Sequence, residues 1–125
     1  MSLNLQKAGK LFVSAISATT IAPVNDAVPA LNAIAISPSA QKAVVVAEIA
    51  SANGSTDIDI MLYGRMRGSK GWQLVPGGDV DDLETQTDDR KVFILDDPFI
   101  YDNLYLRMDT YTAEGTLSAW YAEIG

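Results

Sequence analysis

The sequence predicts an all-β protein, an antiparallel β-sandwich, and three observations carry this prediction. Residues 58–67 and 104–112 alternate apolar and polar side chains with a period of two, the pattern of a half-buried strand. Turn-forming residues such as Asn53-Gly54-Ser55 and Gly68-Ser69-Lys70-Gly71 recur at short intervals. No segment has a convincing helical period. About seven to nine short strands at this spacing favour a sandwich, of which the jelly roll is one form, with an extended N-terminal arm.

Residues 1–41 are predicted to form the N-terminal arm and the first strands. The arm carries only three charged residues. It also has too few large apolar residues for a core of its own, so it is expected to pack on the sandwich or on a neighbouring subunit. Strands are expected at 11–21 and 31–37. A short helix near 27–35 is the alternative, which Pro29 disfavours unless it lies in the first helical turn.

Residues 42–125 are predicted to form the sandwich, within a single domain overall. The run Val44-Val45-Val46 in a strand at 42–50 is apolar at consecutive positions, which is typical of a strand buried on both faces. In the two alternating strands, every second side chain is expected to face the core. These expected core residues are Ile58, Ile60, Leu62, Met66, Leu104, Leu106 and Met108.

The remaining strands are predicted from their turn signals. The turn at 68–71 leads into a hairpin strand at 72–75, which Pro76-Gly77-Gly78 is expected to end. The acidic stretch 79–89 has no compensating base and indicates an exposed loop or a sheet edge. Further strands are expected at 91–95, 104–112 and 116–124.

Composition disfavours several classes of function. Nine Lys and Arg against sixteen Asp and Glu give a net charge of −7, which opposes binding to nucleic acid and to anionic membranes. The chain has no His and no Cys, so the commonest metal ligand, the commonest general base and the thiolate are all missing. We therefore predict no enzyme activity, no catalytic residue, no metal and no cofactor. Residues 11–24 imitate a signal peptide, but Ser and Thr dilute the apolar run.

Clustered carboxylates raise two further possibilities. Residues 79–84 have the oxygen ligands that calcium prefers, but they lack the glycine and the glutamate spacing of an EF-hand, so a solvated loop is the preferred interpretation. Paired carboxylates can hydrolyse glycosidic bonds when they face each other across a cleft. Asp57 and Asp59 are expected on an outward face, and Asp96-Asp97-Pro98 is typical of a turn that ends a strand.

Aromatic and arginine side chains at outward strand positions are the candidate functional residues. Such groups serve a protein interface or a sugar-binding platform, and Tyr is also simply favoured in strands. The basic residues of 65–70 are expected to form ion pairs at the rim of such a surface. The predicted interface residues are Tyr63, Arg65, Trp72, Tyr105, Arg107 and Tyr111 on the strands, with Leu11, Phe12 and Val13 in the arm.

From about residue 58 to 124 the chain resembles the β-sandwich domains of small virion proteins of tailed bacteriophages. The resemblance is carried by the hairpin Gly68-Ser69-Lys70-Gly71-Trp72, by Leu104-Tyr105-Leu106-Arg107-Met108, and by Glu114-Gly115-Thr116 before the last strand. It covers a little over half of the chain. Fibronectin-like and carbohydrate-binding sandwiches share the same rhythm.

The resemblance implies a structural subunit of a capsid or tail, such as a head decoration (cement) protein. Its expected partners are further copies of itself, with a trimer favoured, and a major capsid or tail protein. Its expected location is the virion, after assembly in the host cytoplasm. The alternative is a carbohydrate-binding or adhesion module that uses Trp72, Tyr63, Tyr105 and Tyr111, with a glycan as the ligand.

Overall fold

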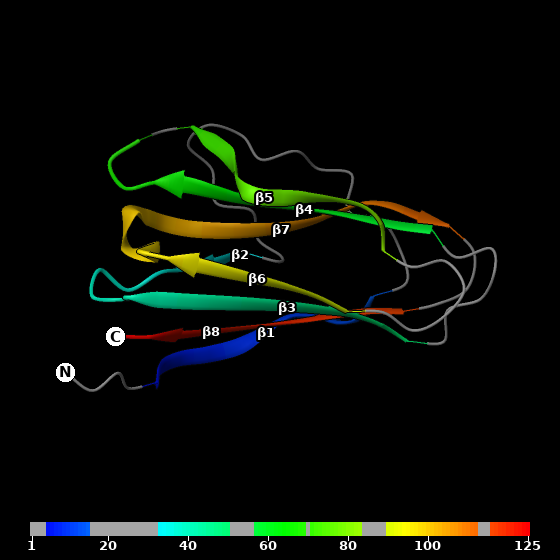
Figure 1. Ribbon diagram of the computed structural model, residues 1–125, viewed down its shortest axis with the longest axis horizontal. Coiled ribbons are helices and arrows are strands. Elements are labelled where there is room, and N and C mark those ends of the chain that lie inside the picture. Colours follow the sequence, from blue (N-terminus) through cyan, green and yellow to red (C-terminus); the bar gives the residue numbers. More distant parts are fainter. Residues whose placement is uncertain (1–4, 16–32, 51–56, 70, 84–89, 113–115) are drawn as a thin grey trace.

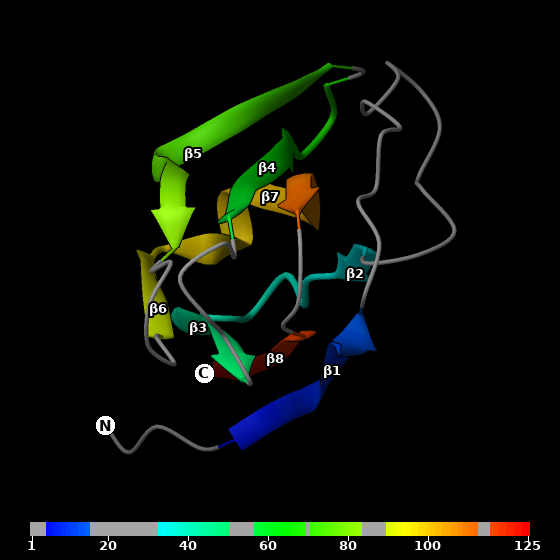
Figure 2. The same ribbon diagram turned by 90° about the vertical axis from the view of Figure 1, so that its right-hand side faces the viewer.

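The computed structural model describes residues 5–15, 33–50, 57–69, 71–83, 90–112 and 116–125, which form a sandwich of two four-stranded antiparallel sheets (Figures 1 and 2). Sheet A has the strand order β1-β8-β3-β6 and sheet B has the order β2-β7-β4-β5. The strands are β1 (Leu5–Ala15), β2 (Ala33–Ala35), β3 (Lys42–Ala50), β4 (Asp57–Met66), β5 (Trp72–Leu83), β6 (Arg90–Asp96), β7 (Tyr101–Thr112) and β8 (Thr116–Ile124), and a short 3₁₀ helix, η1 (Pro98–Ile100), precedes β7.

The strand order is that of a jelly roll, so the sequence prediction of the fold class is confirmed. The chain crosses between the sheets at almost every connection, and only β4 and β5 are consecutive strands of one sheet. Strands that pair are therefore mostly distant in the sequence, as in the pairing of β1 with β8 and of β4 with β7. Jelly rolls serve as viral capsid domains, lectins and cupins, so the fold leaves the function open.

Strand boundaries agree best with the prediction in the middle and at the end of the chain. The strands expected at 42–50 and 116–124 are β3 and β8 with those bounds. In the arm, β1 at Leu5–Ala15 overlaps the strand expected at 11–21, and β2 at Ala33–Ala35 lies within the one expected at 31–37. Residues 16–21 lie outside the described part. The strand β1 pairs with β8 from Leu5 onward, so it begins earlier than local composition indicates. The helix alternative is wrong for residues 33–35, and residues 27–32 lie outside the described part.

The segment Pro76-Gly77-Gly78 does not end β5, contrary to the prediction. The strand continues to Leu83 along the edge of sheet B. Register with β4 shifts between Tyr63, which faces Leu74, and Met61, which faces Asp79. Gly77 has a positive φ of 73°, and a Cβ on Gly78 would lie 2.5 Å from the Leu62 carbonyl oxygen. The glycines therefore absorb extra residues in a bulge, and residues 79–83 form an edge strand.

The core lies between the sheets and is filled mainly by alternate residues of the strands. Ile60, Leu62, Leu104 and Leu106 are buried as predicted. Met66 was expected in the core but is 42% exposed, because the register between β4 and β7 shifts between Arg65 and Met66. The side chains of Ile58 and Met108 lie outside the described part. Sheet A supplies Ala43, Val45, Ala47, Ile49, Phe93, Leu95, Leu117, Ala119 and Tyr121.

A glycine in β4 makes room for an aromatic ring of the core. Gly64 lies at an inward position between Leu62 and Met66, and a Cβ built on it would lie 2.5 Å from Cδ1 of Tyr101. Tyr101 is itself 7% exposed, so its ring has little freedom to move away. The close packing of this ring on the bare backbone requires glycine at position 64.

One carboxylate is buried in the core near the end of β8. Glu123 is fully buried and accepts a hydrogen bond from the hydroxyl of Tyr121, which is also buried. The backbone N–H of Ser37 donates to the same carboxylate, with distances of 3.3 Å to Oε1 and 3.4 Å to Oε2. This pair of donors joins β8 to the segment that leaves β2. A buried carboxylate without such partners would be strongly destabilising.

We predict that Gly64→Ala lowers the free energy of unfolding by about 1–3 kcal/mol, because the added methyl overpacks the core against Tyr101. Gly71→Ala is the matched control, since a Cβ there meets no heavy atom within 4 Å, and its effect should stay within about 0.5 kcal/mol. Urea unfolding of the three proteins measures both values. Equal stability of the two variants would contradict the packing described for Tyr101.

We further predict a loss of stability in alkali that depends on Tyr121. Burial raises the pKa of its hydroxyl, and the hydrogen bond to Glu123 and the charge of that residue raise it further. The folded chain thus keeps a proton that the unfolded chain releases above the ordinary pKa of 10.0. Stability is therefore complete below about pH 10 and falls as the pH rises beyond it.

Melting temperatures at several pH values between about 8 and 11 check this prediction for the wild type and Tyr121→Phe. The variant should be less stable at pH 8 but should lose less on going to high pH. A smaller alkaline loss should persist in it, because burial also raises the pKa of Tyr101 and of Tyr105. Parallel curves for the two proteins would refute the role given to Tyr121.

Candidate functional site

Four of the predicted interface residues meet on the outer face of sheet B. Tyr63 of β4 and Tyr105 of β7 face each other in register, with ring centroids 6.4 Å apart and stacked planes. Trp72 at the start of β5 contacts the Tyr105 ring edge-on at 6.1 Å. The guanidinium of Arg65 lies over the Trp72 ring, with its central carbon 5.6 Å from the centroid. These four residues form the aromatic cluster of sheet B.

Polar contacts hold Arg65 within the aromatic cluster. Its Nε lies 3.0 Å from Oδ1 of Asp102, and one terminal nitrogen donates to Oδ1 of Asn103 at 3.0 Å. Asn103 in turn donates to the carbonyl of Ile34 in β2 at 3.5 Å. A line of contacts thus crosses from β4 through β7 to the edge strand β2. The guanidinium group of Arg65 therefore binds to other residues of the same chain.

Tyr105 was expected at an exposed position, and the structure corrects this expectation. Its side chain does point away from the core between the sheets, but it is only 1% exposed. The strand β7 is interior to sheet B, and Tyr63 and Trp72 pack on the ring, so it is covered on its own face. Burial raises the pKa of Tyr105, while the charge of Arg107 lowers it. The cluster is therefore mainly internal packing, with Tyr63 and Trp72 half-buried at its surface.

The other predicted residues lie on β7 and β1. Arg107 is half-buried further along β7, and its charge acts on Tyr105 of the aromatic cluster. Tyr111 lies in β7, and Leu11, Phe12 and Val13 lie in β1, but their side chains are outside the described part.

Of the basic residues in the predicted patch, Arg67 is directed to backbone oxygens instead of to ion pairs. Its Nε donates to the carbonyl of Phe99 at 3.0 Å, and a terminal nitrogen donates to the carbonyls of Tyr101 at 2.9 Å and Ile36 at 3.3 Å. Arg65 does form an ion pair, with Asp102, but both side chains are half-buried within sheet B, so the pair does not lie at a rim as expected.

A second surface, on the outer face of sheet A, was not singled out by the sequence. Alternation in β3 turns Val45 and Ala47 to the core and leaves Val44 and Val46 on the outside, half-buried. Across the sheet, Val44 is in register with Ile94 on one side and Ala122 on the other, and Val46 with Val92 and Trp120. The sheet A face consists of Val44, Val46, Val92, Ile94, Trp120 and Ala122, with Ile94 64% and Val92 44% exposed.

Two ion pairs close the ends of the sheet A face. At one end Nζ of Lys42 lies 3.6 Å from Oδ1 of Asp96. At the other end Nε of Arg90 lies 2.8 Å from Oε1 of Glu48. In each pair one residue comes from β3 and the other from the opposite position of β6. An apolar centre with a charged rim is the usual anatomy of a protein interface.

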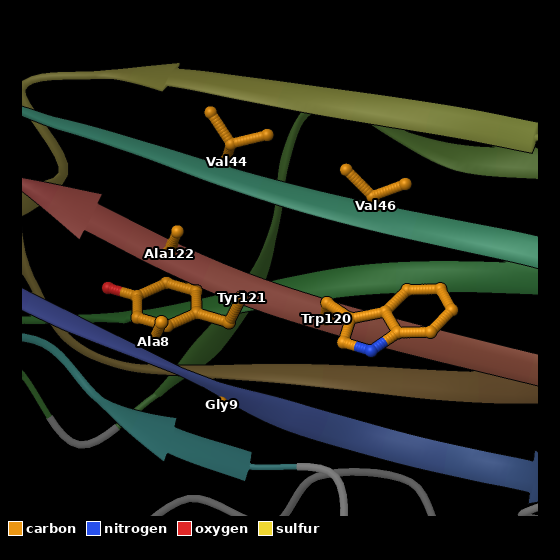
Figure 3. Close-up of a pocket in the computed structure, with 7 residues that line it drawn as sticks. All are labelled: Ala8, Gly9, Val44, Val46, Trp120, Tyr121 and Ala122. Carbon is orange, nitrogen blue, oxygen red and sulfur yellow. The ribbon is translucent and has the colours of Figure 1, made fainter. Parts of the chain in front are cut away.

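The sheet A face is hollowed beside Trp120. Figure 3 shows Trp120 and Ala122 side by side on β8, flanked by Val44 and Val46 on β3 and by Ala8 on β1. These residues, with Gly9 and Tyr121, line an open hollow of about 440 Å³. The hollow exists because small side chains at Ala8 and Ala122 stand in register beside the large indole. Its lining offers contact to an apolar group and little polar chemistry.

The run Val44-Val45-Val46 was the signal that could have located this surface. It predicts a strand buried on both faces, and the residues that the structure describes cover only one of these faces. Trp120 carried no signal of its own, because its neighbours on β1 and β3 are known only from the sheet order.

Chemically reactive groupings are not seen among the residues that the structure describes. No group of three or more His, Cys, Asp or Glu there could hold a metal ion. The side chains of residues 79–83 and all of 84–89 are outside that part, so the calcium interpretation is not addressed. None of the described helices is both long and apolar enough to cross a membrane.

Comparison with known proteins places the fold and no more. No family model and no curated protein matches the sequence. Among solved structures the chain is similar to the SPBc2 prophage-derived protein YomS, with a TM-score of 0.58 over 100% of this chain and 96% of that one. The fold is shared with a prophage-derived protein. With 9% sequence identity, the likeness to YomS concerns the architecture alone.

We predict that Arg65 stabilises the fold. Arg65→Ala should lower the free energy of unfolding by about 1.5–3 kcal/mol, because it removes charge-assisted hydrogen bonds and leaves Asp102 and Asn103 without this donor. Arg65→Lys keeps a charge but cannot reproduce the two-pronged geometry, so its loss should be smaller. Chemical unfolding gives the order wild type, Lys variant, Ala variant. A value within about 0.5 kcal/mol of wild type for Arg65→Ala would overturn this assignment.

Proposed function

We propose that the chain is a non-enzymatic structural subunit of a phage particle, acting as a capsid decoration (cement) protein or as another accessory head or tail subunit. Its partners are further copies of the chain and a major capsid or tail protein, and its place is the virion, assembled in the host cytoplasm. The chain shares its fold with the prophage-derived protein YomS, and this supports its assignment to a phage.

The sheet A face is the observation that carries this proposal. Its centre is apolar and partly exposed, its ends are charged, and the adjoining hollow has an apolar lining. A soluble chain gains nothing from exposing Ile94 and Val92 together, whereas a subunit of an assembly buries such a surface. The contact needs no catalytic group, only a partner of matching shape.

The geometry favours this function over a carbohydrate-binding module. A sugar platform needs aromatic faces that are open to the ligand. Tyr105 is buried, and the Trp72 ring contacts the Tyr105 ring and lies beneath the guanidinium of Arg65. The rings of the aromatic cluster thus pack on one another and on Arg65, which occupies the surfaces that a sugar would need. The centre of the sheet A face, by contrast, is apolar, which suits a protein partner better than a sugar.

Particle composition tests the proposal. Particles released by the strain that carries the chain should be purified on a density gradient and analysed by quantitative mass spectrometry. We expect the wild-type chain in the particle fraction, in many copies per particle. Its absence from intact particles would reject the proposal. A glycan array with the wild type and Trp72→Ala provides the comparison, since binding that depends on Trp72 would favour the carbohydrate-binding module instead.

A further inference from the structure

We propose that the sheet A face binds the same face of a second copy of the chain, related by a twofold axis that lies in the interface and runs across the strands. The inference rests on the proposed function for its biological setting and names the partner of that surface. It is carried by the order of charged and apolar residues along β3, β6 and β8. When a second copy presents the same residues in the opposite order, opposite charges face each other at the ends and apolar side chains face each other in the middle.

Four levels of outward side chains follow one another along the sheet. The register of β3 with β6 and β8 places them as follows: Lys42 and Asp96, then Val44, Ile94 and Ala122, then Val46, Val92 and Trp120, and last Glu48, Arg90 and Ser118. A twofold axis across the strands reverses this order in the second copy while each strand stays opposite itself. The first level then faces the fourth level of the other copy, and the second faces the third.

Charges match under this arrangement at both ends. Lys42 faces Glu48 of the second copy, and Asp96 faces Arg90 of the second copy. Together with the ion pairs already present within each chain, each end gathers two cations and two anions. An axis along the strands through the middle of sheet A places β3 opposite β8, sets Lys42 against Ile124 of the second copy and leaves the charges without opposite partners. If this axis lay between β3 and β6, it would set Lys42 against Asp96 of the second copy, but β8 with Trp120 would lie outside the contact. Of these axes, only the one across the strands both matches the charges and covers Trp120.

Apolar side chains also match in size. The second level faces the third, so Ala122 lies opposite Trp120 of the second copy, and Val44 lies opposite Val46. A large indole thus meets the hollow lined by Ala8 and Ala122, and the symmetry makes this contact twice. On β6, Ile94 meets Val92 of the second copy, which covers the two most exposed side chains of the sheet A face.

The size and the charge of the surface suit such a contact. The four strands of sheet A, about 4.8 Å apart and on average nine residues long with a rise of about 3.3 Å each, span about 570 Å² per copy. A contact over the whole sheet, β1 included, therefore exceeds the roughly 500 Å² per partner that separates specific interfaces from packing contacts. The chain has a net charge of −7, yet the four described charges at the rim are two cations and two anions. Among the described charges of this face, cations and anions are therefore balanced, although the chain as a whole is acidic.

The mass of the full chain in solution is the first test. Analytical ultracentrifugation from about 1 µM to 1 mM should show a species of twice the 13.4 kDa chain mass. Ile94→Asp should raise the dimer dissociation constant by about a hundredfold or more, because each dimer then buries two charges against apolar side chains. Leu74→Asp is the matched control, an exposed apolar residue on sheet B (43% against 64% for Ile94), and should leave the dissociation constant unchanged.

Exchanging the charges tests the symmetry. Lys42→Asp with Asp96→Lys exchanges the charges of one ion pair and keeps the net charge, but it sets like charges against Glu48 and Arg90 of the second copy. Glu48→Arg with Arg90→Glu does the same at the other end. Each exchange alone should weaken the dimer about tenfold or more. The fourfold variant restores opposite charges at both ends and should return the dissociation constant to near the wild-type value.

The outcomes separate this inference from the proposed function. A monomer up to about 1 mM, a trimer, or a dimer that survives Ile94→Asp would overturn the inference. If the dimer is lost in Ile94→Asp but its dissociation constant is the same in the charge-exchange variants as in the wild type, the twofold register is wrong. Melting curves confirm that each variant is folded. A monomeric chain that is present in particles rejects only this inference, and a dimeric chain that is absent from them rejects only the proposed function.

Discussion

The constraint on which the structure depends is the alternation of side chains along a β-strand. Apolar residues at consecutive positions of β3 cannot all reach one core, so Val45 enters it and Val44 and Val46 face outward. Because β3 pairs with β6 and β8 over most of its length, the outward residues of three strands are brought into register. The same ladders therefore build the core on one side and an apolar surface on the other.

The fold class and most strands were predictable from the sequence because alternation and turn residues act locally. The bounds of β3 and β8 agree with the prediction, and the inward positions of Ile60 and Leu62 follow from period two alone. The predictions that were wrong concern features that depend on pairing between strands distant in the sequence. The shift beside Met66 arises from its partner strand, and the continuation of β5 past Pro76 arises from a bulge against β4. Local sequence carries neither piece of information.

The candidate surfaces, too, were predictable where local sequence decides and not where distant strand pairing decides. Tyr63, Arg65, Trp72 and Tyr105 were expected together, and they are together, but exposure of Tyr105 depends on which strands flank it. When an interior strand has large side chains on the strands at both sides, these neighbours bury its outward side chains. Of the sheet A face, only the part on β3 has a signal in the sequence, the run Val44-Val45-Val46, because the other residues come from strands that only the jelly-roll order makes adjacent. A surface made of distant segments has no local signature.

The position of β8 between β1 and β3 has a consequence for the order in which the chain folds. These two strands do not pair with each other, so sheet A stays divided until β8 is available to join them. During synthesis, the segment after residue 115 must leave the ribosome before the hollow at Trp120 exists and before Glu123 can receive the N–H of Ser37. The sheet A face is thus complete only after β8 has been synthesised, and a nascent chain without β8 does not present it.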